Sequence, residues 1–281
     1  TKDGIYYFSH KTVTPDLIEI TLKKRFQTYV IPGDTLKITC NLDPDLNENE
    51  AIKIEGVFGI ISDYFSKKHD ILGYWEISQP LTEFANIKYP LERAIFLTDS
   101  LFQSEAAFLD DYNNRNKLPN WFYEILKSDI DYFKVAYRPS IIGFRKFFFK
   151  DTISNPKEYY NFEKISLYNP RAKLSRYYYD CIGLYFMVNN EEGLENKSGT
   201  SRALPLFERS IPEVKKTLKG DILEYYLAFK TSELFEASRS VEELQQVDSL
   251  FIKIQSQFTQ HEIIRILEKQ REDRTEFLTK R

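Results

Sequence analysis

The sequence predicts an α+β chain, in which an N-terminal antiparallel β-sandwich-like domain (residues 1–95) precedes an all-α helical-hairpin domain (residues 96–281). Three observations predict it. Short segments of alternating apolar and polar residues, separated by turn residues, fill the first part. From about Thr98, apolar residues recur every three or four positions, as on a helix face. The length of 281 residues suits two domains of average size.

The predicted strands lie close together in the β-rich domain. Alternation marks residues 17–22 and 35–40 as half-buried strands, and a shorter one covers residues 52–54. The Pro-Gly-Asp of residues 32–34 predicts a turn. The acidic stretch 41–50 lacks the regular spacing and the glycine of a calcium loop, so we expect a solvated loop.

Helical spacing continues through most of the second domain. The apolar faces lie in residues 101–112, 122–133, 174–188, 222–235, 244–258 and 263–267. Pro139 and Pro156 each suit the first turn of a helix, and Asn169-Pro170 pairs an N-cap with proline at the next position. The polar stretch 189–202, with two glycines, predicts a loop.

The last two helices are predicted to form an antiparallel hairpin. Ser240 to Glu243 and Thr259 to Glu262 both match the capping-box pattern at a helix start. The first helix carries a narrow apolar seam, which we expect to face the preceding helix with Phe251 as its most buried member. Helix pairs of this kind suggest a solenoid-like array, although no regular repeat length supports a tetratricopeptide array.

Composition limits the classes of partner. The 39 basic and 42 acidic residues give a net charge of −3, which offers no basis for binding a nucleic-acid backbone. The 19 Tyr and 22 Phe are expected to fill helix seams, with a sugar- or peptide-stacking surface as the alternative. Residues 177–179 and 159–160 are Tyr clusters, and Phe147 to Phe149 cannot all face one core from a helix, which indicates an interface.

Reactive groups are few. His10, His69 and His261 have no second His or Cys at metal-ligand spacing, and His261 fits the exposed first turn of a helix. Cys40 and Cys181 each continue an apolar face, so packing is favoured over reactivity.

Catalytic and cofactor motifs are also missing. The chain contains no Cys-x-x-Cys, nucleophile elbow, phosphate-binding glycine pattern or metal-ligand cluster. We therefore assign no catalytic, cofactor-binding or metal-binding residue, and no cofactor.

The start of the chain bears on its compartment. The sequence begins at Thr1 rather than Met, and neither a signal peptide nor an apolar run of membrane-spanning length is present. We expect that the chain is part of a longer protein whose targeting segment is missing.

Several short motifs occur in the same order as in a known family. They resemble the β-domain and helical region that precede the thioredoxin-like domain of envelope thiol-disulfide oxidoreductases, with Pro-Gly-Asp and the Leu-Lys-Gly approach to a late helix as the most distinctive. The matching segments are residues 29–38, 54–56, 61–65, 162–170, 219–221 and 224–227.

The resemblance implies a function for the chain. In that family the activity resides in a Cys-x-x-Cys of the thioredoxin-like domain, where a helix N-terminus and a neighbouring thiol support the reaction. Such a domain would start just beyond Arg281. The implied function is therefore a non-catalytic accessory module, positioning or contacting a C-terminal thioredoxin-like domain or an envelope protein. The implied location is the periplasm or outer envelope, with lipid anchoring as an option.

A rival interpretation comes from a different class. The second interpretation is a stand-alone envelope protein that binds peptides or glycans through exposed aromatics, without redox activity. A hydrolase is disfavoured because no nucleophile and base are paired in the sequence.

Overall fold

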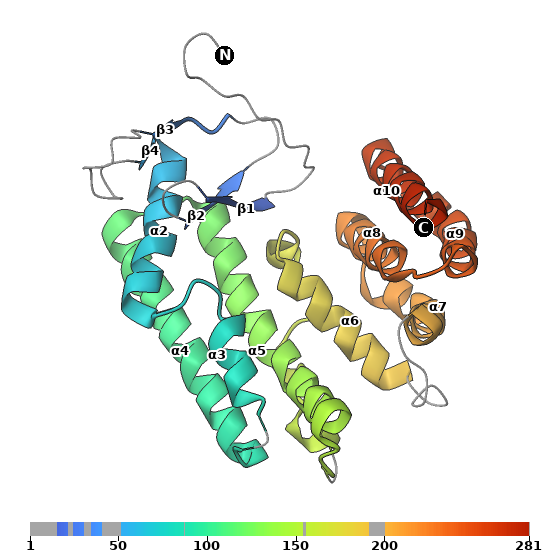
Figure 1. Ribbon diagram of the computed structural model, residues 1–281, viewed down its shortest axis with the longest axis horizontal. Helices are drawn as coiled ribbons and strands as arrows, with labels where there is room; N and C mark the ends of the chain where they lie inside the picture. The colour runs from blue at the N-terminus through green and yellow to red at the C-terminus, as the bar shows by residue number, and fades with distance from the viewer. Residues whose placement is uncertain are drawn as a thin grey trace. The chain divides into compact units, whose positions relative to one another are not determined.

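The computed structural model describes residues 16–21, 25–30, 35–40, 52–86, 88–153, 156–190 and 200–280. The chain is α+β, with short strands first and helices through most of the remaining length (Figure 1). It divides into two compact units, residues 1–127 and 128–281. The division falls inside α5 (Asn120–Phe149).

The described strands pair two by two. β1 (Asp16–Thr21) and β2 (Arg25–Val30) form one antiparallel sheet, while β3 (Ile38–Cys40) and β4 (Ile52–Ile54) form another. Sequence alternation predicted β1, β3 and β4 to within a few residues. It missed β2, because Gln27 and Thr28 are both buried and interrupt the alternation. The described residues show these two small sheets and no larger sandwich.

Helices already occur inside the region predicted to be β-rich. α2 (Val57–Leu72) packs on β2, and α3 (Ser78–Phe84) and α4 (Leu91–Asn116) follow. Gly59 allows α2 to start close to β4, since a Cβ at this position would lie 2.5 Å from the carbonyl oxygen of Ile54. The helical period therefore begins well before Thr98. The turn at residues 32–34 and the loop at 41–50 lie outside the described residues.

An aromatic cluster forms the core of unit 1. The buried ring of Tyr64 has its centroid 5.3 Å from those of Phe65, Phe108 and Tyr112, and 5.7 Å from that of Phe122. These rings meet mostly edge to face, an arrangement that aromatic quadrupoles favour. In this unit the abundant aromatics fill the seams between helices, as expected.

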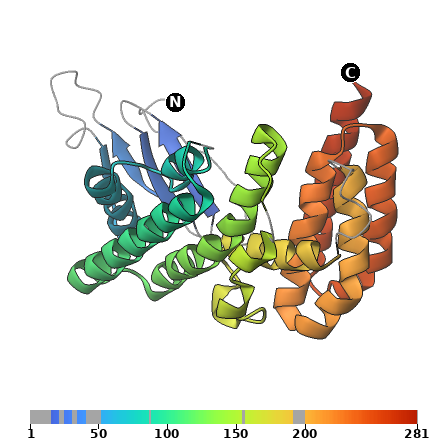
Figure 2. The same ribbon diagram turned by 90° about the horizontal axis from the view of Figure 1, so that it is seen from below.

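Unit 2 consists of the second part of α5 and the helices that follow it. These are α6 (Arg176–Asn190), α7 (Thr200–Thr217), α8 (Gly220–Ala237), α9 (Val241–Ile254) and α10 (His261–Thr279). Short 3₁₀ turns are η1 (Pro156–Tyr159), η2 (Phe162–Lys164), η3 (Pro170–Ala172) and η4 (Gln255–Gln257). Figures 1 and 2 both show α8, α9 and α10 side by side, in orange to red.

The closing hairpin agrees with the prediction. Val247, at 0% exposed, is the most buried member of the seam, and Phe251, which we expected to be the most buried, follows at 1%. An ion pair of 2.9 Å joins Arg271 of α10 to Asp248 of α9. These two positions lie on either side of the connecting turn, as antiparallel helices require.

The two predicted capping boxes differ in outcome. Ser240 caps α9 by accepting a hydrogen bond from the Glu243 amide at 3.2 Å, as predicted. The second box is wrong. Glu224 of α8 instead accepts hydrogen bonds from the Thr259 hydroxyl (2.6 Å), the Thr259 amide (3.0 Å) and the Gln260 amide (3.3 Å). A carboxylate from another helix therefore holds the two residues that precede α10, and no side chain caps the helix itself.

Prolines account for the other differences. Pro139 lies inside α5 rather than at a helix start, and α7 was not predicted because it contains Pro205 and Pro212. Asn169 does act as an N-cap, accepting a hydrogen bond from the Arg171 amide at 3.2 Å, but it caps η3 rather than α6.

None of the helices in the described part of the chain is both long and apolar enough to cross a membrane.

Candidate functional site

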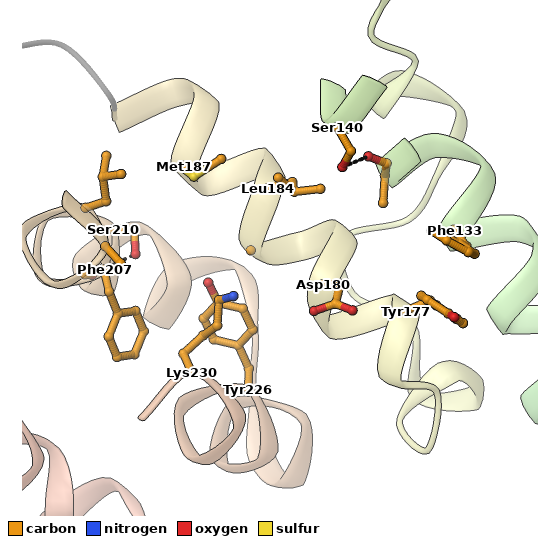
Figure 3. A pocket seen from close by; sticks show the side chains of 14 residues that line it. Phe133, Ser140, Tyr177, Asp180, Leu184, Met187, Phe207, Ser210, Tyr226 and Lys230 are labelled. Carbon is orange, nitrogen blue, oxygen red and sulfur yellow. Dashed lines mark hydrogen bonds between the residues drawn. The ribbon is translucent and has the colours of Figure 1, made fainter. Parts of the chain in front are cut away.

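Unit 2 contains a cavity of about 330 Å³ between four helices, which we call the α5–α8 groove (Figure 3). α5 and α6 supply part of its wall, and α7 and α8 supply the rest. Its lining residues are Phe133, Ala136, Ser140, Tyr177, Asp180, Gly183, Leu184, Met187, Ala203, Leu206, Phe207, Ser210, Tyr226 and Lys230.

Two stacked rings form the aromatic part of the wall. The centroids of Phe133 on α5 and Tyr177 on α6 lie 4.0 Å apart, with only 6° between the ring planes. In Figure 3 the two rings lie face to face and are seen edge-on. Both side chains are half-buried, so part of each ring borders the groove.

The start of α6 fixes the position of Tyr177. Ser175 caps the helix by accepting a hydrogen bond from the Tyr178 amide at 3.1 Å, and its hydroxyl donates to Asp129 of α5 at 2.5 Å. Burial raises the pKa of Asp129 to about 7, although the Ser175 hydroxyl and the Tyr177 amide oppose the shift. The cap of α6 and its hydrogen bond to α5 therefore hold the ring of Tyr177 against the ring of Phe133.

Buried tyrosines anchor the segment that leads into α6. Tyr132 donates to the Ser166 carbonyl and Tyr178 to the Leu167 carbonyl, both at 2.8 Å. The side-chain amide of Asn169 donates to the Tyr132 hydroxyl at 3.0 Å. Each tyrosine thus fills the core with its ring and satisfies the backbone with its hydroxyl.

A lysine crosses between α6 and α8. A Cβ on Gly183 would lie 2.7 Å from Cε and 2.8 Å from Nζ of Lys230, so the lysine passes where any larger residue would collide with it. Its ammonium group forms an ion pair of 2.5 Å with Glu233. A larger residue at position 183 would therefore displace the end of this flexible side chain from its place beside the groove.

Asp180 adds a carboxylate to the same wall. Burial raises its pKa, and Glu233 raises it further, whereas Lys230 and Arg176 favour the charged form. On the opposite side, the buried Ser210 hydroxyl donates to the Phe207 carbonyl at 2.7 Å. The groove thus combines apolar and aromatic walls with one carboxylate, one ammonium group and a few hydroxyls, a lining typical of a binding site.

The groove does not contain a reactive thiol. Cys181 is fully buried and unbonded, and it packs in the core cluster of unit 2. Burial, with a contribution from Asp180, raises the pKa of its thiol, so the nucleophilic thiolate is suppressed. This confirms that Cys181 is a packing residue. The side chain of Cys40 lies outside the described side chains.

The histidines lie away from the groove. His261 is exposed in the first turn of α10, as predicted. His69 is half-buried, and its ring stacks on that of Trp75 with 4.5 Å between the centroids. His10 lies outside the described residues. Where side chains are described, no three His, Cys, Asp or Glu residues group together as metal ligands.

Sequence reasoning did not predict the groove. Asp180, Lys230 and Glu233 occur as ordinary helical charges, and Leu184 and Met187 as part of an apolar face. Two signals were available. One was the Tyr cluster at residues 177–179, of which Tyr177 lines the groove, and the other was the glycine at position 183 within a strong helical pattern, which often marks close packing.

Comparisons with family models, curated proteins and solved structures found no match to the chain.

Proposed function

We propose that the chain is the non-catalytic N-terminal region of a thioredoxin-like thiol-disulfide oxidoreductase of a bacterial envelope, in which unit 2 binds a partner polypeptide. The sequence resemblance supports the family, and the two small antiparallel sheets are compatible with a β-sandwich-like N-terminal region. The proposed location is the periplasm or outer envelope. The proposed partner is a thioredoxin-like domain or another envelope protein.

The α5–α8 groove is the observation that carries this proposal. Leu184, Met187 and Leu206 offer apolar surface to side chains of a bound polypeptide, while Asp180 and Lys230 offer opposite charges to its polar groups. Catalysis of thiol exchange needs an accessible thiolate, and the pKa and burial of Cys181 work against one. The groove therefore favours binding of a polypeptide over catalysis of thiol exchange.

The reading frame of the gene beyond the codon for Arg281 tests the family. We expect a thioredoxin-like segment there with a Trp-Cys-x-x-Cys-like motif, because the resemblance places that domain directly after the helical region. A stop codon at this point would refute the proposal and leave the stand-alone interpretation.

The second candidate is a stand-alone envelope protein that binds peptides or glycans. The stacked pair of Phe133 and Tyr177 favours it, because an aromatic wall suits both ligands. Binding to a glycan array, lost on Tyr177→Ala and kept on Tyr168→Ala, would support glycan recognition. Tyr168 is a suitable control since it is exposed and does not line the groove.

A further inference from the structure

The C-terminal end of α5 carries an exposed aromatic cluster flanked by lysines, which we call the α5 tip (residues 144–150). Phe147 and Phe148 are 66% and 62% exposed, and Phe149 is 36% exposed. Phe144 supports them, with its centroid 4.6 Å from that of Phe148 and 5.8 Å from that of Phe149. Large rings are rarely left in water in this number at one place, so the cluster indicates a contact surface.

The directions of the rings restrict what could cover them. Successive residues of a helix are turned by about 100° from one another. Phe147, Phe148 and Phe149 therefore leave α5 in different directions, although the rings of Phe147 and Phe148 come together with 4.9 Å between their centroids. A groove in a folded partner receives side chains from one face of a helix, at positions three and four apart. A fluid apolar medium accepts rings on several sides at once.

The charges at the tip are basic. Asp151 is already bound to Arg145 at 2.7 Å and does not neutralise the neighbouring lysines. Lys146 and Lys150 are both exposed. Lys150 donates to the Phe147 carbonyl at 3.0 Å and lies 5.5 Å from the Phe147 ring, which places its charge beside the aromatic cluster.

We propose that the α5 tip docks on the surface of an anionic phospholipid bilayer. The Phe rings enter the boundary between headgroups and acyl chains, and the two lysines remain at the level of the lipid phosphates. This contact is independent of the α5–α8 groove and adds a surface-binding role to the function proposed above. It requires no membrane-spanning segment.

Vesicle flotation tests the proposal with the intact chain. We expect the chain to float with phosphatidylcholine–phosphatidylglycerol vesicles, less at high salt, and not with phosphatidylcholine alone. Phe147→Ser with Phe148→Ser should lower the apparent affinity about tenfold or more, because both inserted rings are lost. Lys146→Gln with Lys150→Gln should weaken binding and reduce its salt dependence.

A matched control separates the tip from general surface hydrophobicity. Ile71 and Ile252 are 67% and 61% exposed, much as the two Phe residues are, but lie on other helices. Ile71→Ser with Ile252→Ser should leave flotation unchanged, with both double variants folded by circular dichroism. Absence of flotation by the wild type, or equal loss in both double variants, would overturn the proposal.

Insertion itself can be observed at one position. Phe148→Trp should be quenched by anionic vesicles that contain brominated acyl chains, beyond any quenching of the wild type, since the ring enters the bilayer. Absence of this additional quenching would overturn the proposal. So would a wild-type dimer that becomes a monomer on Phe147→Ser with Phe148→Ser, because the tip would then join two copies of the chain.

Discussion

Cys181 illustrates how position on a helix sets reactivity. It lies in the core of unit 2, where burial raises the pKa of its thiol. We predict that native Cys181 reacts slowly with a thiol reagent and reacts readily once the chain is unfolded. Peptide mapping after labelling distinguishes it from Cys40. Rapid native labelling of Cys181 would show that its environment has been assigned incorrectly.

Asp129 should make stability depend on pH. Its pKa rises from an ordinary value of 3.8 to about 7, chiefly through burial and partly through Asp180, while Arg176 opposes the rise. Between these two values the native state holds a proton that the unfolded state has released, so the free energy of unfolding should fall as pH increases. Above about pH 7 this contribution becomes constant.

Asp129→Asn provides the test of that dependence. An amide oxygen can still accept the hydrogen bond of Ser175, so the cap of α6 is kept while the titration is removed. We expect the difference in the free energy of unfolding, variant minus wild type, to be larger at pH 8 than at pH 5. Urea unfolding at the two pH values measures it. An equal difference at the two pH values would contradict the assignment.

For single residues, the sequence predicted those properties that depend only on which face of a helix the side chain occupies. The packing of Cys181 and the exposure of His261 follow from helical spacing alone. The raised pKa of Asp129 and the path of Lys230 across Gly183 do not, because each depends on a contact between helices. Such contacts require the tertiary arrangement.

Among the helices, the seam of α9 gives a prediction about stability. Replacing a buried Phe by Ala costs about 3–5 kcal/mol through lost transfer energy and the cavity left behind. Phe251→Ala should therefore lower the midpoint of denaturant unfolding clearly. Lys253→Ala is the control, with an expected effect under about 0.5 kcal/mol, since its ion pair with Glu208 is exposed. Equal midpoints would show that the helical phase is wrong.

The contact between Glu224 and the segment before α10 gives a second prediction for the helices. Glu224→Gln removes the charge and one acceptor oxygen from a buried group that binds Thr259 and Gln260. We expect a loss of about 1–3 kcal/mol in the free energy of unfolding. Hydrogen exchange in the first turn of α10 should also become faster. The control is Glu262→Gln, at an exposed position in the first turn of α10. It should change neither the free energy of unfolding nor the exchange rate, and equal effects of the two variants would refute the role of Glu224.

The elements differ in how far the sequence could define them. α9 followed from its seam and its Ser240 cap. α7 did not, because Pro205 and Pro212 are strong signals against a helix that packing has overridden. β2 was hidden by buried polar residues, and the anchoring of Thr259 before α10 was hidden because Glu224 lies on another helix. In each case tertiary contacts outweighed the local pattern.

For the whole molecule, the proposed function predicts an absence of redox turnover. The purified chain should not reduce insulin in the presence of dithiothreitol above the rate without protein, since Cys181 is buried with a raised pKa and no vicinal dithiol exists in the sequence. Turnover that disappears on Cys40→Ser or Cys181→Ser would show that a thiol of this chain is catalytic.

The overall organisation was predicted in outline. The change from strand period to helix period gave the α+β class, and the length gave two units. The helices α2 and α4 belong to the same compact unit as the strands, with Tyr64 and Phe108 in one core. Periodicity identifies elements but does not show which core they share.

The central claim is that the α5–α8 groove binds a polypeptide, and its most direct measurement is fluorescence polarisation with a library of labelled extended peptides. Met187→Lys places a charge on the groove wall, whereas Ile252→Lys places one on an exposed position of α9. We predict saturable binding of a subset of peptides by the wild type and by Ile252→Lys, and a loss of about tenfold or more in Met187→Lys. Saturable binding to none of the peptides, or equal binding by both variants, would contradict the claim.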